Sequence, residues 1–377
     1  MSAIGSSWQP TWFCDFNAGS RVNEEVLELF VATESEHPAN PASVHAPGRR
    51  ARAVLEQARE RIAAALGLVA ADVLFTSGGT EAANLAITGL GDRSLPVLLS
   101  PAEHPAVYEP ALERGTALMA VDRSGITAVA TPGTRVGLVA LVHAQSELGT
   151  VQPVADAASL ARELGVPLFV DAAQSLGRLD LGPVVASGAI VALSPHKAFG
   201  IRGHGVLAGR GLQHGLRPML RGGAQEHGLR PGTQSPALAL ANALAIERAV
   251  AHRDDRVGTM RAVRSEFLTG LRTLVVDHEV LTPEANSVPN TVMIAFRGVD
   301  GRNLLPALDL AGVHASHGSA CSSGAPTPPR ILRAIGLDDA LARACVRFSF
   351  SGDEARGSMH DAGARAAQVV QRLQKKM

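Results

Sequence analysis

Short continuous apolar runs alternate with amphipathic segments along most of the chain. A short apolar run bounded by polar or glycine-containing turns predicts a strand buried on both faces, whereas apolar positions recurring every three or four residues predict a helix. Strands are expected at residues 13–16, 73–76, 97–100, 117–121, 136–142, 167–171, 190–193 and 205–208. Helices are expected at residues 23–31, 45–66, 81–87, 106–114 and 154–164.

Continuous apolar strands that alternate with helices are typical of a mostly parallel sheet covered by helices on both faces. The sequence therefore predicts an α/β fold. Beyond a helix at residues 236–252 the order changes, which predicts a large domain at residues 15–252 and a smaller α+β domain at residues 253–377 that includes residues 1–14. The elements expected there are helices at 260–274 and 304–311, strands at 288–296 and 346–350, and a final helix ending at Lys376.

Polar residues follow many of the expected strands at the point where each strand ends. In a parallel sheet these positions gather at one edge and line the ligand crevice. We therefore expect a small-molecule site at this edge. The residues are Ser77 to Thr80, Glu103 with His104, Gln145 with Ser146, Asp171 with Gln174, and Ser194 with His196 and Lys197.

Composition and charge exclude several classes of function. The 377 residues have a formal net charge of zero and no basic cluster, so we expect no nucleic-acid partner. No apolar run is long enough for a membrane span, and the first ten residues lack the features of a secretory signal. The three cysteines show no disulfide or zinc spacing. A cytoplasmic protein without a metal is the expectation.

One lysine is set apart from the other basic residues. Lysine occurs only at Lys197, Lys375 and Lys376, and all the other strongly basic side chains are arginine. A lysine amine can lose its proton and attack a carbonyl to form a Schiff base, whereas a guanidinium stays charged. Lys197 follows an apolar strand, within Ser-Pro-His-Lys. Composition alone leaves open that it is an ordinary surface lysine.

The segment Ser77-Gly-Gly-Thr80 joins an expected strand to an expected helix. The free backbone N–H groups and the dipole at such a helix start bind anions such as phosphate, here around Gly79 and Thr80. Many strand–helix turns of this kind bind nothing, so this signal is weak by itself.

Asp171 and His104 each allow two interpretations. Asp171 ends an apolar strand, where a carboxylate would be stabilised by a cation such as a protonated pyridine nitrogen, or it is the N-cap of a following helix. His104, in Ala-Glu-His-Pro, is either a helix cap or an imidazole that lies on a cofactor ring and relays protons.

The cysteines and one arginine also carry candidate chemistry. Cys321 lies among glycine, serine and alanine, which predicts a mobile, exposed loop and favours a nucleophile. Cys14 and Cys345 lie in apolar runs and are expected in the core. Arg347, in an apolar strand, requires a carboxylate, either from a ligand or from a structural ion pair.

Several of these motifs occur in the order seen in one known family. They are Ser-Gly-Gly-Thr-Glu-Ala-Ala-Asn84, Ala-Glu-His104, Val-Asp-Ala-Ala-Gln-Ser175, Ser-Pro-His-Lys197, the run from Arg221 to Thr233, Gly-Ser-Ala-Cys321 and Arg-Phe-Ser349. The chain resembles cysteine desulfurases of the NifS/IscS type, in the class V aminotransferase group of fold-type I pyridoxal-phosphate enzymes. The resemblance runs from about Asp15 to the C-terminal helix, and the Gly-Ser-Ala-Cys motif is the part that implies desulfurase activity.

The resemblance implies roles in binding pyridoxal 5'-phosphate. Lys197 would attach the cofactor covalently and later move the substrate's α-proton. Asp171 would pair with the pyridinium nitrogen, Gln174 would bond the ring oxygen and His104 would stack on the ring. The phosphate would be held by Gly79, Thr80, Ser194, His196 and, from the partner subunit of a homodimer, Thr233.

The resemblance also implies L-cysteine as substrate and an acceptor protein for its sulfur. Arg347 and Asn40 would bind the substrate carboxylate. Cys321 would attack the substrate sulfur and become a persulfide, and alanine would be released. The sulfur would then pass to the acceptor for a thio-modification or an iron–sulfur pathway.

The chain departs from the family pattern at three places. Gln145-Ser146-Glu147 stands where the family has Asn-Asn-Glu, so the contact of the second asparagine with the cofactor falls to Ser146 or a water. Asp15-Phe-Asn-Ala-Gly-Ser-Arg21 replaces Asp-x-x-Ala-Thr-Thr-Pro, and His317 replaces a serine. Two alternatives therefore stay open: another class V lyase acting on C–S or C–Se bonds, such as selenocysteine or cysteine-conjugate lyase, and a weakened scaffold of a sulfur pathway.

Overall fold

The computed structural model describes residues 12–318 and 328–375, which form two compact units. The larger unit comprises Gly19–Gln145 and Thr150–Asp254. The smaller unit comprises the described residues up to Ala18, the short segment Ser146–Gly149, and the described residues from Asp255 onward. Compared with the expected boundaries, this division assigns residues 15–18 and 146–149 to the smaller unit and residues 253–254 to the larger one. Asn17, for example, hydrogen-bonds Ser349 and Ser146.

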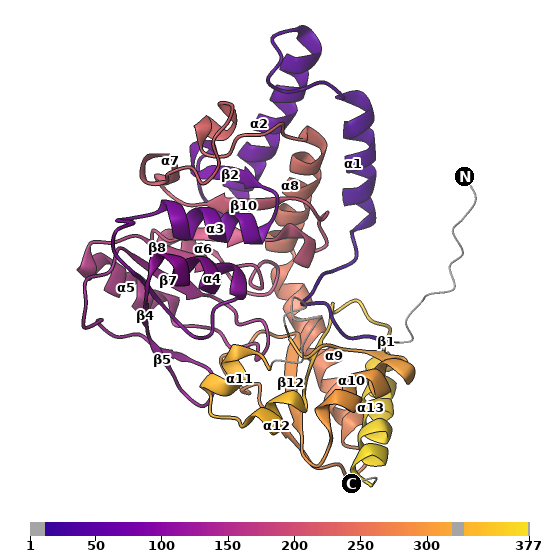
Figure 1. Ribbon diagram of the computed structural model, residues 1–377. Coiled ribbons are helices and arrows are strands. Elements are labelled where there is room, and N and C mark those ends of the chain that lie inside the picture. The colour runs from indigo at the N-terminus through magenta and orange to yellow at the C-terminus, as the bar shows by residue number, and fades with distance from the viewer. Residues whose placement is uncertain (1–11, 319–327, 376–377) are drawn as a thin grey trace. The chain divides into compact units, whose positions relative to one another are not determined.

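A seven-stranded sheet is the framework of the larger unit, with strand order β2-β10-β9-β8-β7-β3-β4 (Figure 1). All neighbouring pairs are parallel except those of β10, which runs antiparallel to both β2 and β9. The mostly parallel sheet expected from the apolar runs is confirmed. The strands are β2 (Val73–Thr76), β3 (Val97–Leu99), β4 (Thr116–Leu118), β7 (Leu138–Val142), β8 (Leu168–Asp171), β9 (Ile190–Leu193) and β10 (Gly205–Ala208).

Helices cover both faces of this sheet. One face packs against α2, α5, α6 and α8, with α1 against α8, and the other packs against α3, α4 and α7 (Figure 1). Both layers bury apolar side chains, which is the main stabilising term in such folds. The helices are α1 (Glu24–Glu36), α2 (Ala46–Leu66), α3 (Gly79–Gly89), α4 (Pro105–Arg114), α5 (Val154–Leu164), α6 (Gly182–Ala186), α7 (Leu212–Gly215) and α8 (Pro236–Ala251), with short 3₁₀ turns at Ala70–Asp72, Pro195–Lys197 and Gln225–Gly228.

The smaller unit is built on a three-stranded antiparallel sheet of order β11-β12-β14. Its core lies between this sheet and the helices α9, α10 and α13, where Phe267 contacts the rings of Phe348 and Phe350. A parallel pair, β1 with β13, completes the unit. The elements are β1 (Trp12–Phe13), α9 (Arg253–Leu271), β11 (His278–Val280), β12 (Thr291–Phe296), α10 (Gly301–Leu310), β13 (Val313–His314), α11 (Arg330–Ala334), α12 (Asp339–Arg343), β14 (Cys345–Ser349) and α13 (Ser358–Gln374).

Some expected elements differ from those observed. The single strand expected at residues 117–121 is divided: β4 belongs to the large sheet, whereas β5 (Ala120–Val121) pairs with β6 (Thr127–Ala128). Expected strand 13–16 is shorter, since β1 ends at Phe13 and Asp15 makes only an isolated bridge to Ser349. The helix expected from residue 260 begins at Arg253. The sequence pattern missed its first turns because none of their residues is buried, so they show no apolar period.

A buried histidine makes the larger unit sensitive to acid. His204 is 6% exposed, its ring centroid lies 5.1 Å from that of Phe75, and neither ring nitrogen has a hydrogen-bond partner among the described residues. Burial, reinforced by the positive charges of Arg230 and Arg59, lowers the pKa of His204 from 6.5 to about 4. An unfolded chain therefore takes up a proton below pH 6.5 that the folded chain does not bind until about pH 4.

We expect His204→Phe to reduce the loss of unfolding free energy between pH 7 and pH 4. A depressed histidine pKa gives stability that is fully present above the unfolded pKa and is lost as the pH falls towards the folded one. At about 1.4 kcal/mol per pKa unit the effect is up to about 3 kcal/mol. Urea denaturation of wild type and variant at matched pH values measures it, with the exposed His252→Phe as control. A pH dependence unchanged by His204→Phe would contradict the assignment.

Candidate active site

The carboxyl ends of neighbouring strands bring several expected site residues together in the larger unit. Asp171 ends β8 and is paired with Ala192 in β9, two residues before Ser194. The C-terminal end of β2, which leads into α3, lies at the same edge because β2 and β9 both neighbour β10 in antiparallel register. This is the edge at which open α/β sheets bind ligands.

The turn between β2 and α3 has the shape of an anion-binding site. A Cβ atom on Gly79 would lie 2.2 Å from Ser194 Oγ, so glycine at this position leaves room for the Ser194 hydroxyl. A Cβ atom on Gly205 would lie 2.5 Å from the carbonyl carbon of Gly78, so Gly205 allows the two backbones to approach closely. The first N–H groups of an α-helix have no partner within the helix. The free amides of the first turn of α3, the exposed Thr80 and the buried Ser194 hydroxyl therefore form a donor set suited to phosphate.

A carboxylate–arginine pair holds this turn in place. Glu81 Oε2 accepts a hydrogen bond from the backbone N of Ser77 at 2.6 Å, and Glu81 Oε1 accepts one from Arg230 Nε at 2.8 Å. These contacts, the hydrogen bond from Arg230 first among the stabilising ones, outweigh partial burial and lower the pKa of Glu81. The ionised carboxylate thus anchors the turn and the segment that carries Arg230.

Asp171 is buried and uses one oxygen to cap a turn. Its Oδ1 accepts from Ala173 N at 2.9 Å, while Oδ2 makes no hydrogen bond within the described part of the chain. The helix N-cap considered from the sequence is not formed, because the residues after Asp171 make a turn and not a helix. Asp171 caps this turn instead, and because its second oxygen is not used by the cap, the carboxylate can still accept from a cationic ligand.

Lys197 lies in the 3₁₀ turn Pro195–Lys197 directly after β9, where its amide N donates to Ser194 O at 3.0 Å. Ser20 supports the turn: its Oγ donates to His196 O at 2.8 Å and accepts from Phe199 N at 2.6 Å. Phe199 has a φ of 67°, a left-handed conformation that costs energy for a bulky residue. The turn is thus strained and held by several hydrogen bonds.

His196 and His104 are both half-buried. Burial, with smaller contributions from the charges of Lys197 and Arg202, lowers the pKa of His196 to about 4, so its ring is neutral at neutral pH. His104 is the N-cap of α4, and its Nδ1 accepts from Ala106 N at 3.1 Å. Nδ1 of His104 is therefore an acceptor and carries no proton. The helix-cap interpretation is confirmed, and stacking on a cofactor stays a prediction.

These residues fit a phosphorylated pyridine aldehyde. The fit rests on the chemistry of the donor set, with amide and hydroxyl donors at the start of α3, a carboxylate at the end of β8 and an amine after β9. The close approach of Gly79 to Ser194 adds to it, because a side chain at residue 79 would fill the anion cradle. No other lysine lies outside the C-terminal tail.

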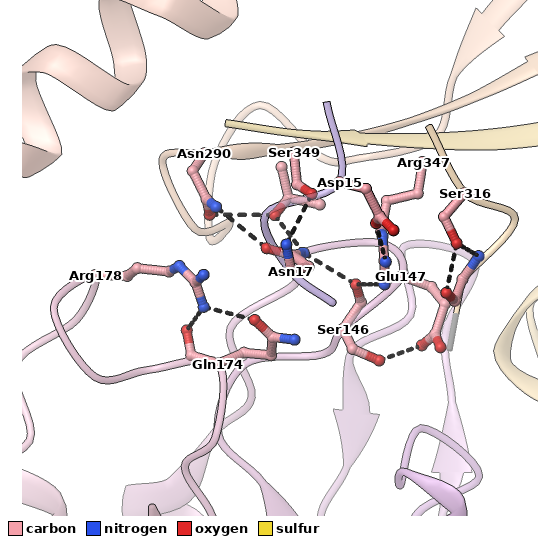
Figure 2. Close-up of polar contacts among 12 residues, drawn as sticks. Asp15, Asn17, Ser146, Glu147, Gln174, Arg178, Asn290, Ser316, Arg347 and Ser349 are labelled. Atoms are coloured by element: carbon pink, nitrogen blue, oxygen red, sulfur yellow. Dashed lines mark hydrogen bonds and ion pairs between the residues drawn. The ribbon is translucent and has the colours of Figure 1, made fainter. Parts of the chain in front are cut away.

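In the smaller unit, Arg347 is the centre of a buried polar cluster (Figure 2). Its side chain is 2% exposed, Nη2 lies 2.7 Å from Asp15 Oδ1, and Nη1 donates to Ser146 O at 3.0 Å. Its Nε is buried without a partner among the described residues. The structural ion pair considered from the sequence is therefore present, and an unused buried donor is available on the same guanidinium. Asn17 reinforces the cluster by donating to Ser146 O at 3.1 Å and to Thr291 Oγ1 at 2.9 Å.

Ser146 contributes its backbone and its hydroxyl to different partners. The Ser146 carbonyl accepts from Arg347 and Asn17, while the Ser146 Oγ donates to Glu147 Oε2 at 2.8 Å (Figure 2). The Ser146 hydroxyl is thus committed to a carboxylate. A contact of Ser146 with the cofactor stays a prediction.

The cysteines differ in what the structure describes. Cys14 and Cys345 are fully buried, as expected, and burial raises the pKa of both thiols, that of Cys345 to about 12. Both are therefore poor nucleophiles at neutral pH. Cys321 lies outside the described residues. His317, four residues before Cys321 in the sequence, has Nδ1 2.7 Å from Cys345 O, and burial lowers the pKa of His317.

Asn40 and Thr233 are both exposed on the larger unit. Asn40 Oδ1 accepts from Ala42 N at 2.9 Å. Among the described residues, neither the Asn40 nor the Thr233 side chain hydrogen-bonds any of the polar residues that follow the strands of the large sheet. The segment that leads to Thr233 is anchored through Glu226, a buried residue with a φ of 50°. Glu226 makes a bidentate ion pair with Arg59, at 2.6 and 2.8 Å, and accepts from Phe75 N at 2.8 Å.

Sequence reasoning missed Arg178, Ser20 and Glu226, which hold the expected site residues in place. Arg178 donates to Gln174 and to the Lys197 carbonyl. An available signal was its position four residues after Gln174, in a segment of small and apolar residues. Ser20 and Glu226 had no comparable signal, because their partners are 176 and 167 residues away in sequence.

None of the helices in residues 12–318 and 328–375 is both long enough and apolar enough to cross a membrane. No three His, Cys, Asp or Glu side chains in these ranges are grouped so that they would hold a metal ion.

Comparison with known proteins agrees with this geometry. The family described as Aminotransferase class-V matches residues 12–356. The chain is 32% identical to the cysteine desulfurase IscS of Dictyoglomus turgidum over 89% of each chain, and 32% identical to the cysteine desulfurase NifS of Azotobacter vinelandii over 90% of this chain and 87% of that one. A solved structure titled NifS-like protein superposes with a TM-score of 0.85 at 27% identity, covering 96% of this chain and all of that one. The chain therefore belongs to the class-V aminotransferase family, within the group of NifS/IscS-type cysteine desulfurases.

Proposed function

We propose that this protein is a pyridoxal-phosphate-dependent cysteine desulfurase, which converts L-cysteine to L-alanine and keeps the sulfur as a persulfide on Cys321. The observation that carries the proposal is the position of Lys197, the only lysine outside the tail, directly after β9 at the same sheet edge as Asp171 and the start of α3. An amine, a buried carboxylate and an anion site at one sheet edge are what this cofactor requires.

The residues of the larger unit would hold the cofactor as follows. Lys197 binds the aldehyde carbon covalently, Asp171 accepts from the pyridine nitrogen, and Gln174 donates to the ring oxygen. His104 would lie against the ring, and Gly79, Thr80, Ser194 and His196 would hold the phosphate. When bound, pyridoxal phosphate supplies an electron sink that weakens bonds to the substrate's α-carbon. The Lys197 amine would take and return the α-proton.

Substrate binding and sulfur transfer are assigned to the remaining residues. Arg347 and Asn40 bind the carboxylate of L-cysteine, and Ser146 lies in the backbone segment that Arg347 holds. The Cys321 thiolate attacks the substrate sulfur, so that one S–S bond forms and the C–S bond of the substrate breaks. Cysteine and a thiol thus become alanine and a persulfide, with atoms and electrons balanced.

We further propose that two copies form a homodimer in which Thr233 of each chain reaches the phosphate site of the other. The exposure of Thr233 on the single chain and the firm anchoring of its segment through Glu226 and Arg230 support this. The persulfide sulfur would pass to an acceptor protein in the cytoplasm. Disulfide trapping between a Thr233→Cys chain and a Thr80→Cys chain tests this contact: a cross-linked dimer is expected, and its absence would contradict the proposed contact.

The proposed function is tested by adding L-cysteine and a thiol reductant to the purified protein with its cofactor. Alanine and sulfide are expected in equal amounts. No alanine from a protein that carries the cofactor would favour a non-catalytic scaffold. Alanine or sulfide formation that is undiminished in Cys321→Ser would favour a lyase that does not use this cysteine.

Asp171→Asn is expected to reduce kcat by about 10²-fold while the protein stays folded. The amide keeps the Oδ1 acceptor for Ala173 N but cannot stabilise a protonated pyridine nitrogen, and a hydrogen bond to a charged group is worth about 1.5–3 kcal/mol. Steady-state kinetics and thermal unfolding measure the two effects. The matched control is Asp180→Asn, an exposed aspartate whose Oδ1 likewise accepts from a residue two positions on. Near-normal kcat in Asp171→Asn would reduce Asp171 to a turn cap.

A further inference from the structure

Arg178 lies in the turns that follow β8 and contacts two residues of the proposed cofactor site. Its Nη1 donates to Gln174 Oε1 at 2.5 Å and to the Gln174 backbone O at 3.0 Å (Figure 2). Its Nη2 donates to the Lys197 backbone O at 3.3 Å. Gln174 and Arg178 are each 5% exposed, so these contacts form in a largely dehydrated environment where hydrogen bonds are strong.

The guanidinium decides which way the Gln174 amide points. The two ends of a glutamine amide have similar shapes, and their assignment depends on their partners. Arginine carries donors only, so the atom of Gln174 that faces Arg178 must be the carbonyl oxygen. The NH₂ group of Gln174 is then directed away from Arg178. Gln174 therefore meets a ligand as a hydrogen-bond donor and not as an acceptor.

The charge of Arg178 strengthens that donor. A guanidinium keeps its proton even when buried, and it draws electron density toward the amide oxygen that it contacts. Hydrogen bonds in a chain polarise one another, so the N–H bonds at the far end of the Gln174 amide become better donors. A strong donor is the group that an anionic ring oxygen requires.

We propose that Arg178 is a positioning residue that holds Gln174 in the one orientation in which it donates to the ring oxygen of the cofactor. Through the Lys197 carbonyl, the same guanidinium also holds the turn that carries the amine. This inference rests on the proposed function, since it assumes that pyridoxal phosphate binds in the larger unit. It assigns a role to a residue that makes no contact with the cofactor in the proposal.

The test uses the purified protein with its cofactor and measures the visible absorbance of the bound cofactor as a function of pH. In Arg178→Met we expect the apparent pKa of the absorbance change to rise by about 1, because a ring oxygen that has lost its donor holds the neighbouring proton more tightly. The Kd for pyridoxal phosphate is expected to rise about tenfold, the effect of one hydrogen bond. Arg178→Lys keeps the positive charge but not the paired N–H donors of the guanidinium. Its absorbance pKa and its Kd should therefore lie between those of Arg178→Met and the wild type, and this variant remains informative if Arg178→Met does not fold.

Two controls separate positioning from stability. Arg114→Met removes another arginine of the larger unit that donates to several backbone carbonyls, and it should leave the absorbance pKa and the Kd unchanged. In a Gln174→Ala background, Arg178→Met should shift the absorbance pKa no further. An equal shift in both backgrounds would overturn the inference, as would an unchanged absorbance pKa and Kd in Arg178→Met and Arg178→Lys. A wild-type protein that binds no pyridoxal phosphate would instead overturn the proposed function.

Discussion

Replacing Lys197 with alanine is expected to reduce the turnover of L-cysteine by at least about 10³-fold. The variant loses the amine that attaches the cofactor and moves the α-proton, and proton transfer by a positioned side chain alone contributes about 10²–10⁴-fold. We expect the variant to stay folded, because it keeps two backbone contacts of the turn: residue 197 N donates to Ser194 O, and residue 197 O accepts from Arg178. Arginine at this position should not restore activity, since a guanidinium stays protonated.

Borohydride reduction shows the attachment directly. Wild-type protein reduced in the presence of pyridoxal phosphate should carry the cofactor on the peptide that contains Lys197, and the Lys197→Ala variant should carry none. Lys375→Ala serves as the control and should be labelled and active like the wild type. A label that maps to Lys375 or Lys376, or a Lys197→Ala variant with wild-type turnover, would contradict the assignment.

The second large effect is expected at Cys321. Cys321→Ser should still bind L-cysteine, seen as a change in the visible spectrum, because the groups that hold the cofactor are untouched. It should form no protein persulfide, because a hydroxyl cannot accept the sulfur. Transfer to an acceptor is therefore expected to fall below detection.

The buried cysteines provide the matched control. Cys345 is fully buried and burial raises its pKa to about 12, so in the native protein Cys345→Ala should leave persulfide formation intact. An alkylating reagent should modify Cys321 much faster than Cys14 or Cys345. Persulfide on either buried cysteine, or undiminished persulfide in Cys321→Ser, would contradict the proposed sulfur transfer.

The sheet of the larger unit was predictable from sequence because its strands are continuous apolar runs. The apolar runs before Ser77 and Ser194 have the same bounds as β2 and β9 in the structure. Strand β8 ends at Asp171, as expected. The antiparallel direction of β10 was not predictable, because a short apolar run has the same appearance in either direction. The division at residues 117–121 was missed for the same reason, since the pairing partner determines to which sheet a residue belongs.

The positions of the expected site residues were predictable where they follow from the end of a strand, and the contacts were not predictable where they involve distant partners. Asp171 and Lys197 are examples of the first kind. Arg347 shows the limit: the sequence predicts that it needs a carboxylate, but the structure was required to find Asp15, 332 residues away. The same holds for Ser146, whose hydroxyl contacts Glu147 and whose carbonyl accepts from Arg347. Such contacts follow from the tertiary fold and leave no local pattern.

The most direct test of the central claim is a single turnover with L-cysteine in the absence of any reductant. The protein with its cofactor is mixed with L-cysteine, quenched with an alkylating reagent, and analysed for alanine and for the mass of each cysteine peptide. The proposed function predicts about one alanine per active chain and one additional sulfur atom on the peptide containing Cys321. Pyruvate instead of alanine, or alanine with no sulfur retained on that peptide, would contradict it.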